Sequence, residues 1–101
     1  FRFTEMNSAN LNGTTLSGAV IAATKMIGAD VSDSDLSNTE ITMSNFENAT
    51  FRNSKFSHAH LLKSNFQRAD MRGTDFNGSK VESVDFSGAL FSNEERKIQA
   101  I

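Results

Sequence analysis

The chain lacks cysteine and proline, and it has no long apolar run. With no cysteine among its 101 residues, it can form neither disulfides nor thiolate metal sites, and its redox compartment stays undetermined. The absence of proline suits a chain in which nearly every backbone N–H is needed for strand pairing. No stretch of about twenty apolar residues is present, so no membrane-spanning helix is predicted. No signal peptide is visible, and the length fits one domain.

What the sequence does contain is a strict period of five residues. From Phe1 to Phe91, every fifth residue is a large apolar side chain, which we call the centre of its unit. Two residues before each later centre, from Thr4 to Ala89, stands a small residue, with Val84 the largest of them. A helix repeats near 3.6 residues and a flat strand at 2, so neither element explains this period. We predict that each small residue and its centre point inward along a short extended segment, and that the next two residues turn a corner.

Four corners close a square, so a second period of twenty residues is predicted, and the sequence contains it. The small residues twenty apart include an unbroken alanine column: Ala9, Ala29, Ala49, Ala69 and Ala89. They also include two hydroxyl columns: Thr14, Ser34, Ser54 and Thr74 in the first, and Thr24, Ser44 and Ser64 in the second. Their hydroxyl groups can bond to local backbone. The two periods together predict a four-sided coil in which residues twenty apart lie over one another.

These units resemble the pentapeptide-repeat family, whose motif is roughly Ala-(Asp/Asn)-Leu-X-X with Leu or Phe at the centre. The resemblance covers residues 1–91, and these units show it: Ala9-Asn10-Leu11-Asn12-Gly13, Ala29-Asp30-Val31-Ser32-Asp33, Ser64-Asn65-Phe66-Gln67-Arg68 and Ala69-Asp70-Met71-Arg72-Gly73. It implies an all-β fold, a right-handed four-sided β-helix solenoid of just under five coils. Adjacent coils in such a fold lie about 4.8 Å apart.

The apolar period ends in the segment 92–101. Ser92 and Glu95 have the spacing of a capping box, which predicts the start of a short C-terminal helix near Asn93. This segment is either a helix that caps the last coil or the beginning of a following domain. Because the chain opens at Phe1 in mid-register, without an initiator methionine, we expect it to be one piece of a longer protein.

Side chains that could carry catalysis or hold a metal are few and scattered. His58 and His60 have no third ligand placed to complete a metal site, so we interpret them as solvated surface histidines. Asp30, Asp33 and Asp35 form the densest carboxylate group, which we interpret as a solvated corner. No base stands near the hydroxyl columns. We therefore expect no enzyme activity in this segment, with no catalytic residue, metal, cofactor or small-molecule substrate.

One face of the predicted coil differs from the other three. Around its centres, from Ile21 to Val81, several outward positions are apolar, and its corners lack the Gly and Asn found elsewhere. We predict a docking site here, called the apolar strip, made of these residues: Phe3, Val20, Ala22, Ala23, Met43, His60 and Leu62. A contiguous exposed apolar surface on a soluble protein usually marks an interaction site. The alternative is a set of scattered surface apolar residues, which are common.

The expected function is therefore a protein–protein interaction or scaffold module within a larger bacterial protein. Its partner would be another protein or an adjacent domain of the same chain, with no nucleic acid and no membrane. The resemblance implies one context for such a module, the secreted effectors that include HECT-like ubiquitin ligases and enter host cells. The expected location is accordingly the cytoplasm, or a host cell after delivery.

The resemblance also implies an alternative, because some members of the family mimic DNA and so inhibit or protect bacterial topoisomerases such as gyrase. Charge argues against this alternative. The chain has twelve acidic and ten basic residues and a net charge of −2. B-DNA carries about one negative charge per 1.7 Å of its length, which is far denser. Direct binding of nucleic acid is not predicted either, since no basic stripe appears.

Overall fold

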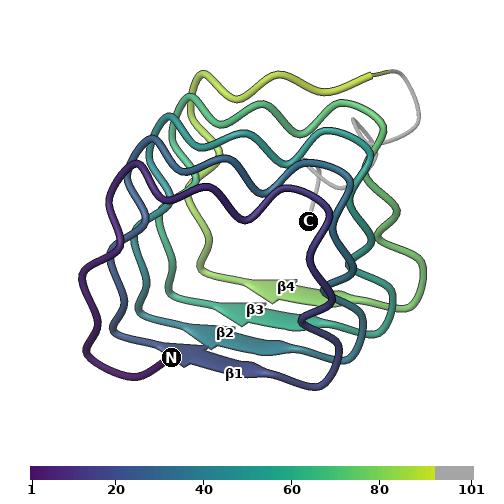
Figure 1. Ribbon diagram of the computed structural model, residues 1–101. Helices are drawn as coiled ribbons and strands as arrows, with labels where there is room; N and C mark the ends of the chain where they lie inside the picture. The colour runs from purple at the N-terminus through teal and green to yellow at the C-terminus, as the bar shows by residue number, and fades with distance from the viewer. Residues whose placement is uncertain (93–101) are drawn as a thin grey trace.

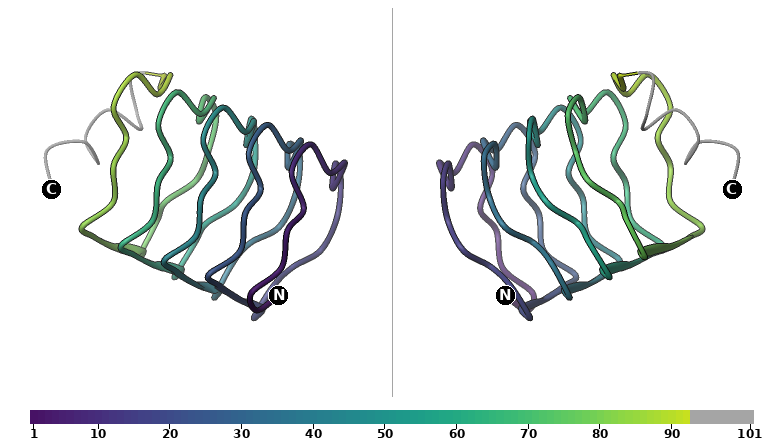
Figure 2. Two further views of the ribbon diagram at one scale, coloured as in Figure 1. Left: turned by 90° about the vertical axis from the view of Figure 1, so that its left-hand side faces the viewer. Right: turned by 90° about the vertical axis from the view of Figure 1, so that its right-hand side faces the viewer.

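The protein winds into a stack of square coils, seen along the stack in Figure 1. This computed structural model describes residues 1–92. Successive coils stack as parallel rungs from the purple N-terminal coil to the yellow-green C-terminal one (Figure 2). The predicted right-handed four-sided β-helix is therefore confirmed. The predicted helix near Asn93 lies outside the described residues, as does all of the segment 92–101 except Ser92.

One side of the square, which we call the sheet face, carries all the regular strands among the described residues. They are β1 (Val20–Ala22), β2 (Glu40–Thr42), β3 (His60–Leu62) and β4 (Lys80–Glu82). The four strands pair in parallel in the order β1-β2-β3-β4. Ile21 lies opposite Ile41, and Ile41 opposite Leu61, so the register is twenty residues. The other sides pair through single bridges with the same register, such as Asn10 with Asp30.

Backbone hydrogen bonds hold neighbouring coils together on every side. The N–H of Met6 donates to the Lys25 carbonyl at 2.7 Å, and the N–H of Lys25 donates back to the Thr4 carbonyl at 2.9 Å. The same exchange recurs along the stack, for example from Phe46 to the carbonyl of Asn65 at 2.7 Å. A proline at such a position would remove a donor, which accounts for the absence of this residue.

The core is a set of columns in which side chains twenty residues apart stack on one another. The rings of Phe46 and Phe66 have centroids 4.8 Å apart, close to the spacing of adjacent strands. Phe56 and Phe76 stack with centroids 5.1 Å apart and planes only 6° from parallel. The three middle alanines of the alanine column are also buried. The predicted columns are therefore confirmed, and the core is a narrow stack along the axis.

The hydroxyl columns also link one coil to the next. The hydroxyl group of Ser44 donates to the Thr42 carbonyl at 3.0 Å, so the predicted bonding to local backbone is confirmed. In addition, Ser44 Oγ accepts the N–H of Thr24 at 3.2 Å, and Ser64 Oγ accepts the N–H of Ser44 at 3.1 Å. Among residues 1–92, no buried side-chain nitrogen or oxygen is left without a partner. These buried residues are therefore cross-links between coils and not simply spacers.

Candidate interaction surface

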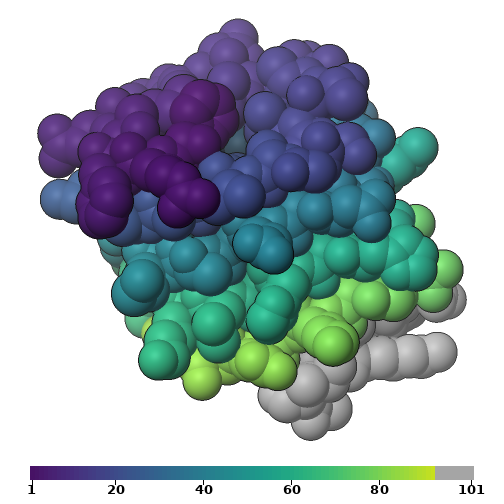
Figure 3. Space-filling view, turned by 90° about the horizontal axis from the view of Figure 1, so that it is seen from below, coloured from purple at the N-terminus to yellow at the C-terminus, as the bar shows by residue number. Residues whose placement is uncertain are grey.

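The sheet face presents three outward rows of side chains that run across the coils. Figure 3 views this face, with the first coil in purple at one end. The strand register fixes two of the rows: Val20, Glu40, His60 and Lys80 in one, and Ala22, Thr42, Leu62 and Glu82 in the other. The third row lies at the corner after each strand: Phe3, Ala23, Met43, Lys63 and Ser83. Five-residue units therefore bring the apolar strip together on one surface.

The corners of the sheet face are built differently from the others. Most other corners are closed by a turn hydrogen bond, such as that from the Ala9 N–H to the Met6 carbonyl at 3.1 Å. No turn bond of this kind closes a sheet-face corner within residues 1–92. There a hydroxyl column supplies the acceptor, because the N–H of Thr24 donates to Ser44 Oγ instead, as the N–H of Ser34 donates to Ser54 Oγ on another side. The sheet-face corner therefore depends on the coil above it.

Two large apolar side chains occupy left-handed positions on this corner. Phe3 has a φ of 52° and is 84% exposed, and Met43 has a φ of 47° and is 64% exposed. Ala23, with a φ of 49°, lies between them in the same row. A left-handed conformation costs a residue with a Cβ about 1–2 kcal/mol, and glycine avoids this cost. Neither internal packing nor backbone preference explains these two side chains.

The remaining members of the apolar strip are less exposed than the sequence alone suggests. Val20, Ala22, Ala23, Leu62 and His60 are each half-buried. The apolar side chains gather around the first coil, β1 and the end of β2, and Leu62 is the only one on β3 or β4 that faces outward. The strip is thus an apolar patch centred on Phe3 and Met43 that fades toward β4.

Toward β4 the sheet face becomes charged. Lys63, Lys80 and Glu82 are all exposed. His60 Nε2 lies 3.4 Å from Glu82 Oε2, so the histidine of the strip belongs to this charged end. The sheet face therefore has an apolar half and a polar half.

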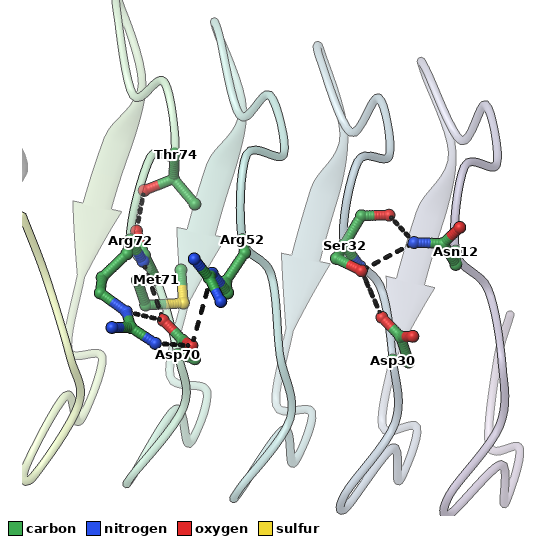
Figure 4. Close-up of polar contacts among 8 residues, drawn as sticks. All are labelled: Asn12, Asp30, Ser32, Arg52, Asp70, Met71, Arg72 and Thr74. Carbon is green, nitrogen blue, oxygen red and sulfur yellow. Dashed lines mark hydrogen bonds and ion pairs between the residues drawn. The ribbon is translucent and has the colours of Figure 1, made fainter.

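On the other three faces, acidic side chains make structural hydrogen bonds. Asp30 Oδ1 accepts both the N–H of Ser32 at 3.0 Å and its hydroxyl group at 2.5 Å (Figure 4). The hydroxyl and backbone N–H of Ser32 hold the pKa of the Asp30 carboxyl below its usual range. Asp35 makes the same pair of bonds with Ser37, and its pKa is lowered for the same reasons. Beyond our interpretation of this group as a solvated corner, Asp30 and Asp35 therefore each shape a turn as well.

The strongest charged cluster surrounds Asp70. Arg72 Nε donates to Asp70 Oδ1 at 2.9 Å, and a terminal nitrogen of Arg72 donates to Oδ2 at 2.8 Å (Figure 4). Arg52 Nε lies 3.9 Å from the same carboxylate. The hydrogen bond from Arg72 is the largest cause of a lowered pKa at Asp70, and the charges of Arg72 and Arg52 act in the same direction. This carboxylate is neutralised by neighbours of its own chain.

Titratable side chains do not gather into a metal site in the described part of the chain. Across residues 1–92, no three His, Asp or Glu side chains converge as metal ligands. His58 lies at a corner with a φ of 58°, on a different side of the square from His60. The same residues contain no helix that is long and apolar enough to cross a membrane. The apolar strip is therefore the main candidate site.

Comparison with known proteins places this geometry in a family. The sequence profile described as Pentapeptide repeats matches eight copies in this chain, over residues 1–38, 15–53, 44–82 and 54–93. No curated protein sequence matches the chain.

Several solved structures share the fold at low sequence identity. A pentapeptide repeat protein, Rfr23 from the cyanobacterium Cyanothece 51142, is 19% identical with a TM-score of 0.85, covering 90% of this chain and 64% of its own. One from the thylakoid lumen of Arabidopsis thaliana is 23% identical with a TM-score of 0.76, covering 94% and 73%. QnrB1, a plasmid-mediated fluoroquinolone resistance protein, is 18% identical with a TM-score of 0.50, covering 88% and 56%.

The chain thus spans less than two thirds of the length of Rfr23 and of QnrB1. At these identities the likeness concerns the fold, and the profile matches extend it to the repeat unit itself. The five-residue units, the twenty-residue register and the profile matches agree, and the chain belongs to the pentapeptide-repeat family.

Proposed function

We propose that this chain is a non-catalytic protein–protein interaction module that docks a protein partner, or an adjacent domain, on the apolar half of its sheet face. The observation that carries this proposal is the exposure of Phe3 and Met43 on one corner row. Large exposed apolar side chains in strained backbone conformations are typical of binding sites.

The energetics of these two residues support docking. Burying an exposed Phe or Met side chain fully is worth about 1.5–3 kcal/mol. A partner that covers Phe3 and Met43 therefore offsets the cost of about 1–2 kcal/mol for each left-handed position. Ala23 adds no bulk between them, so a side chain of the partner can approach the corner there. The half-buried Val20 and Ala22 extend the same apolar surface.

We further propose that the module serves as one domain of a larger bacterial protein, such as a secreted effector of the HECT-like ubiquitin ligase type. The support for this context is the family resemblance and the short span of the chain relative to Rfr23 and QnrB1. In that arrangement the catalytic domain lies elsewhere in the parent protein, and the sheet face attaches to it or to a host protein.

The alternative function, a DNA mimic that acts on gyrase, finds less support in the arrangement of charges. A DNA mimic needs a dense stripe of free carboxylates. Here the carboxylate of Asp70 is paired with Arg72 and approached by Arg52, while Glu47 forms an ion pair with Arg68. The likeness to QnrB1 concerns the fold alone, so we favour the interaction module.

A pair of charge-introducing variants tests the docking proposal. Met43→Glu combined with Leu62→Glu places two carboxylates on the strip, while Ser17→Glu combined with Ser57→Glu makes the same change on a neighbouring face. Surface changes of this kind alter stability by about 0.5 kcal/mol or less, so thermal melting should be nearly unchanged in both proteins. Only the first pair should abolish docking.

The readout is photo-crosslinking of the full-length parent protein in its own cell. A crosslinkable residue at position 43 should give one defined product, identified by mass spectrometry as a partner or as another segment of the same chain. A crosslinkable residue at position 17 serves as the control. If the same crosslinked product also forms from position 17, the strip is not a docking site. The same holds if the product at position 43 still forms when Leu62→Glu is combined with a charged residue at position 22.

A further inference from the structure

The chain contains two Asn-Gly pairs in equivalent turn positions. They are Asn12-Gly13 and Asn77-Gly78, and their glycines have φ values of 72° and 74°. Asparagine is a chemically labile residue, and a following glycine removes the Cβ that would hinder attack by its backbone nitrogen. The two pairs share the same local conformation, so any difference in their reactivity must come from their surroundings.

The surroundings of Asn12 hold both reacting groups in hydrogen bonds. The N–H of Gly13 donates to the Ser32 carbonyl at 3.0 Å. The side-chain nitrogen of Asn12 donates to the same carbonyl at 3.1 Å and to Ser32 Oγ at 2.8 Å (Figure 4). Attack of Gly13 nitrogen on the Asn12 side chain requires these bonds to open together.

Asn77 is held much less. Within residues 1–92, the N–H of Gly78 donates no hydrogen bond, and the Asn77 side chain makes none. The backbone N–H of Asn77 donates to Asp75 Oδ1 at 2.9 Å, which fixes the turn while leaving the side chain exposed. Within residues 1–92, neither reacting group is therefore held in a hydrogen bond, in contrast to the pair at Asn12.

A histidine lies directly beside the second pair. A Cβ built on Gly78 would lie 2.5 Å from His58 Nδ1 and 2.6 Å from its Cε1, so the imidazole occupies the space next to this glycine. The backbone N–H of His58 also donates to the Asn77 carbonyl at 2.9 Å. Around Gly13, by contrast, nothing lies within 4 Å of the same position. Imidazole accepts and donates protons near neutral pH, which is what this reaction requires.

We propose that Asn77-Gly78 is a self-modification site, at which Asn77 deamidates spontaneously with His58 as the proton acceptor. The nitrogen of Gly78 forms a bond to Cγ of Asn77 and loses its proton to His58, and the side-chain amide nitrogen leaves as ammonia. Water then hydrolyses the cyclic imide on either side, giving aspartate or isoaspartate. Overall, one amide and one water become one carboxylate and ammonium, without an oxidant, reductant or enzyme.

The modification would alter the coil that carries β4. Both products add a negative charge close to Asp75. The isoaspartate product also inserts a methylene group into the backbone, in a coil whose corners recur at five-residue spacing. Asn77 therefore accumulates the modification with time in the coil that carries β4, while Asn12 reacts more slowly.

The test compares the two sites in the same molecule. The purified full chain is incubated at neutral pH, and peptide mapping by mass spectrometry follows deamidation at positions 12 and 77. Methyl transfer by an isoaspartyl methyltransferase detects the isoaspartate product. We expect Asn77 to react at least about tenfold faster than Asn12 in the folded protein, because the bonds to Ser32 must open first at Asn12.

Two comparisons make the test decisive. In urea, the unfolded chain should deamidate at similar rates at both sites, since each asparagine precedes glycine. The variant His58→Asn keeps a residue that tolerates positive φ and should slow Asn77 several-fold in the folded state only. Equal rates at the two sites in the folded protein would overturn the site itself. An unchanged folded-state rate in His58→Asn would overturn the role of the histidine.

Discussion

Replacing Phe66 by alanine tests the columnar core most directly. Phe66 is fully buried, and its ring stacks on Phe46 with centroids 4.8 Å apart. It also packs against the rings of Phe51 and Phe86, with centroids 5.4 and 5.5 Å away. Because each coil packs only against its neighbours, nothing else can fill the space that the ring leaves. The variant should therefore bear nearly the whole cost of the cavity.

The expected magnitude follows from burial and ring contacts. A buried Phe→Ala change lowers the free energy of unfolding by about 3–5 kcal/mol. Each aromatic ring pair that is lost removes about 0.5–1.5 kcal/mol of stabilisation. We expect the free energy of unfolding to fall by about 4 kcal/mol. With a urea dependence of about 2 kcal/mol per molar, the midpoint of unfolding moves down by about 2 M.

Phe3→Ala is the matched control, since it removes the same ring from a side chain that is 84% exposed. The free energy of unfolding should then change by no more than about 0.5 kcal/mol. Urea titrations followed by circular dichroism measure both variants, and equal slopes would show that each unfolds as one unit. A loss below about 1 kcal/mol for Phe66→Ala, or equal losses for the two variants, would refute the columnar core.

Two further predictions concern hydrogen bonds. Ser44→Ala removes the acceptor of the Thr24 N–H and the donor to the Thr42 carbonyl, so unfolding free energy should fall by about 1–3 kcal/mol and amide exchange at Thr24 should quicken. The pKa of the Asp70 carboxyl is lowered by its hydrogen bond to Arg72, so its stabilisation is full above the unfolded-state pKa and disappears as pH falls through the folded-state pKa. Asp70→Asn should therefore flatten the fall in stability below about pH 4, measured by urea titration at several pH values.

Each of these predictions has a control on the same chain. Ser17→Ala changes an exposed serine whose side chain makes no hydrogen bond among residues 1–92, and it should leave stability unchanged. Asp33→Asn changes an exposed aspartate that likewise lacks a side-chain bond in the described part, and it should leave the pH dependence as it is. If Ser17→Ala lowers the free energy of unfolding as much as Ser44→Ala does, the hydroxyl column of Ser44 does not stabilise the coils. If Asp33→Asn flattens the acid transition equally, Asp70 has no special part in it.

The repeat periods made most of the fold predictable. A corner every five residues and a register of twenty follow from steric and packing rules that apply equally to each unit, so one error in a unit does not propagate. The stacking of Phe46 on Phe66 and the distinct character of the face around Ile41 could both be inferred in this way. The C-terminal helix near Asn93 stays a prediction, because it lies outside the described residues.

The finer chemistry of the corners could not be predicted from the periods. The bond from Thr24 N–H to Ser44 Oγ joins side chain and backbone across coils, and it depends on rotamers that a repeat pattern does not specify. The structural carboxylates did leave a signal that was missed, a serine two residues after aspartate, as in Asp30 with Ser32 and Asp85 with Ser87.

The extent of the apolar strip was also beyond the sequence pattern. Exposure at the outward positions depends on the size of the side chains that neighbour them on the adjacent coils. Phe3 and Met43 project from the corner row, whereas Leu62 is half-buried. That this surface docks a partner remains a prediction.

The register of twenty residues limits how the length of this protein can change. Removal of residues 41–60 would join Glu40 to Leu61 at equivalent points of the square, so the merged strand and β4 would still lie on the same side as β1. Removal of only five residues would rotate everything after the deletion by a quarter turn, so that β4 would face a different direction from β1. Gain or loss of whole circuits therefore lengthens or shortens the protein without moving the sheet face, whereas any other insertion divides that face in two.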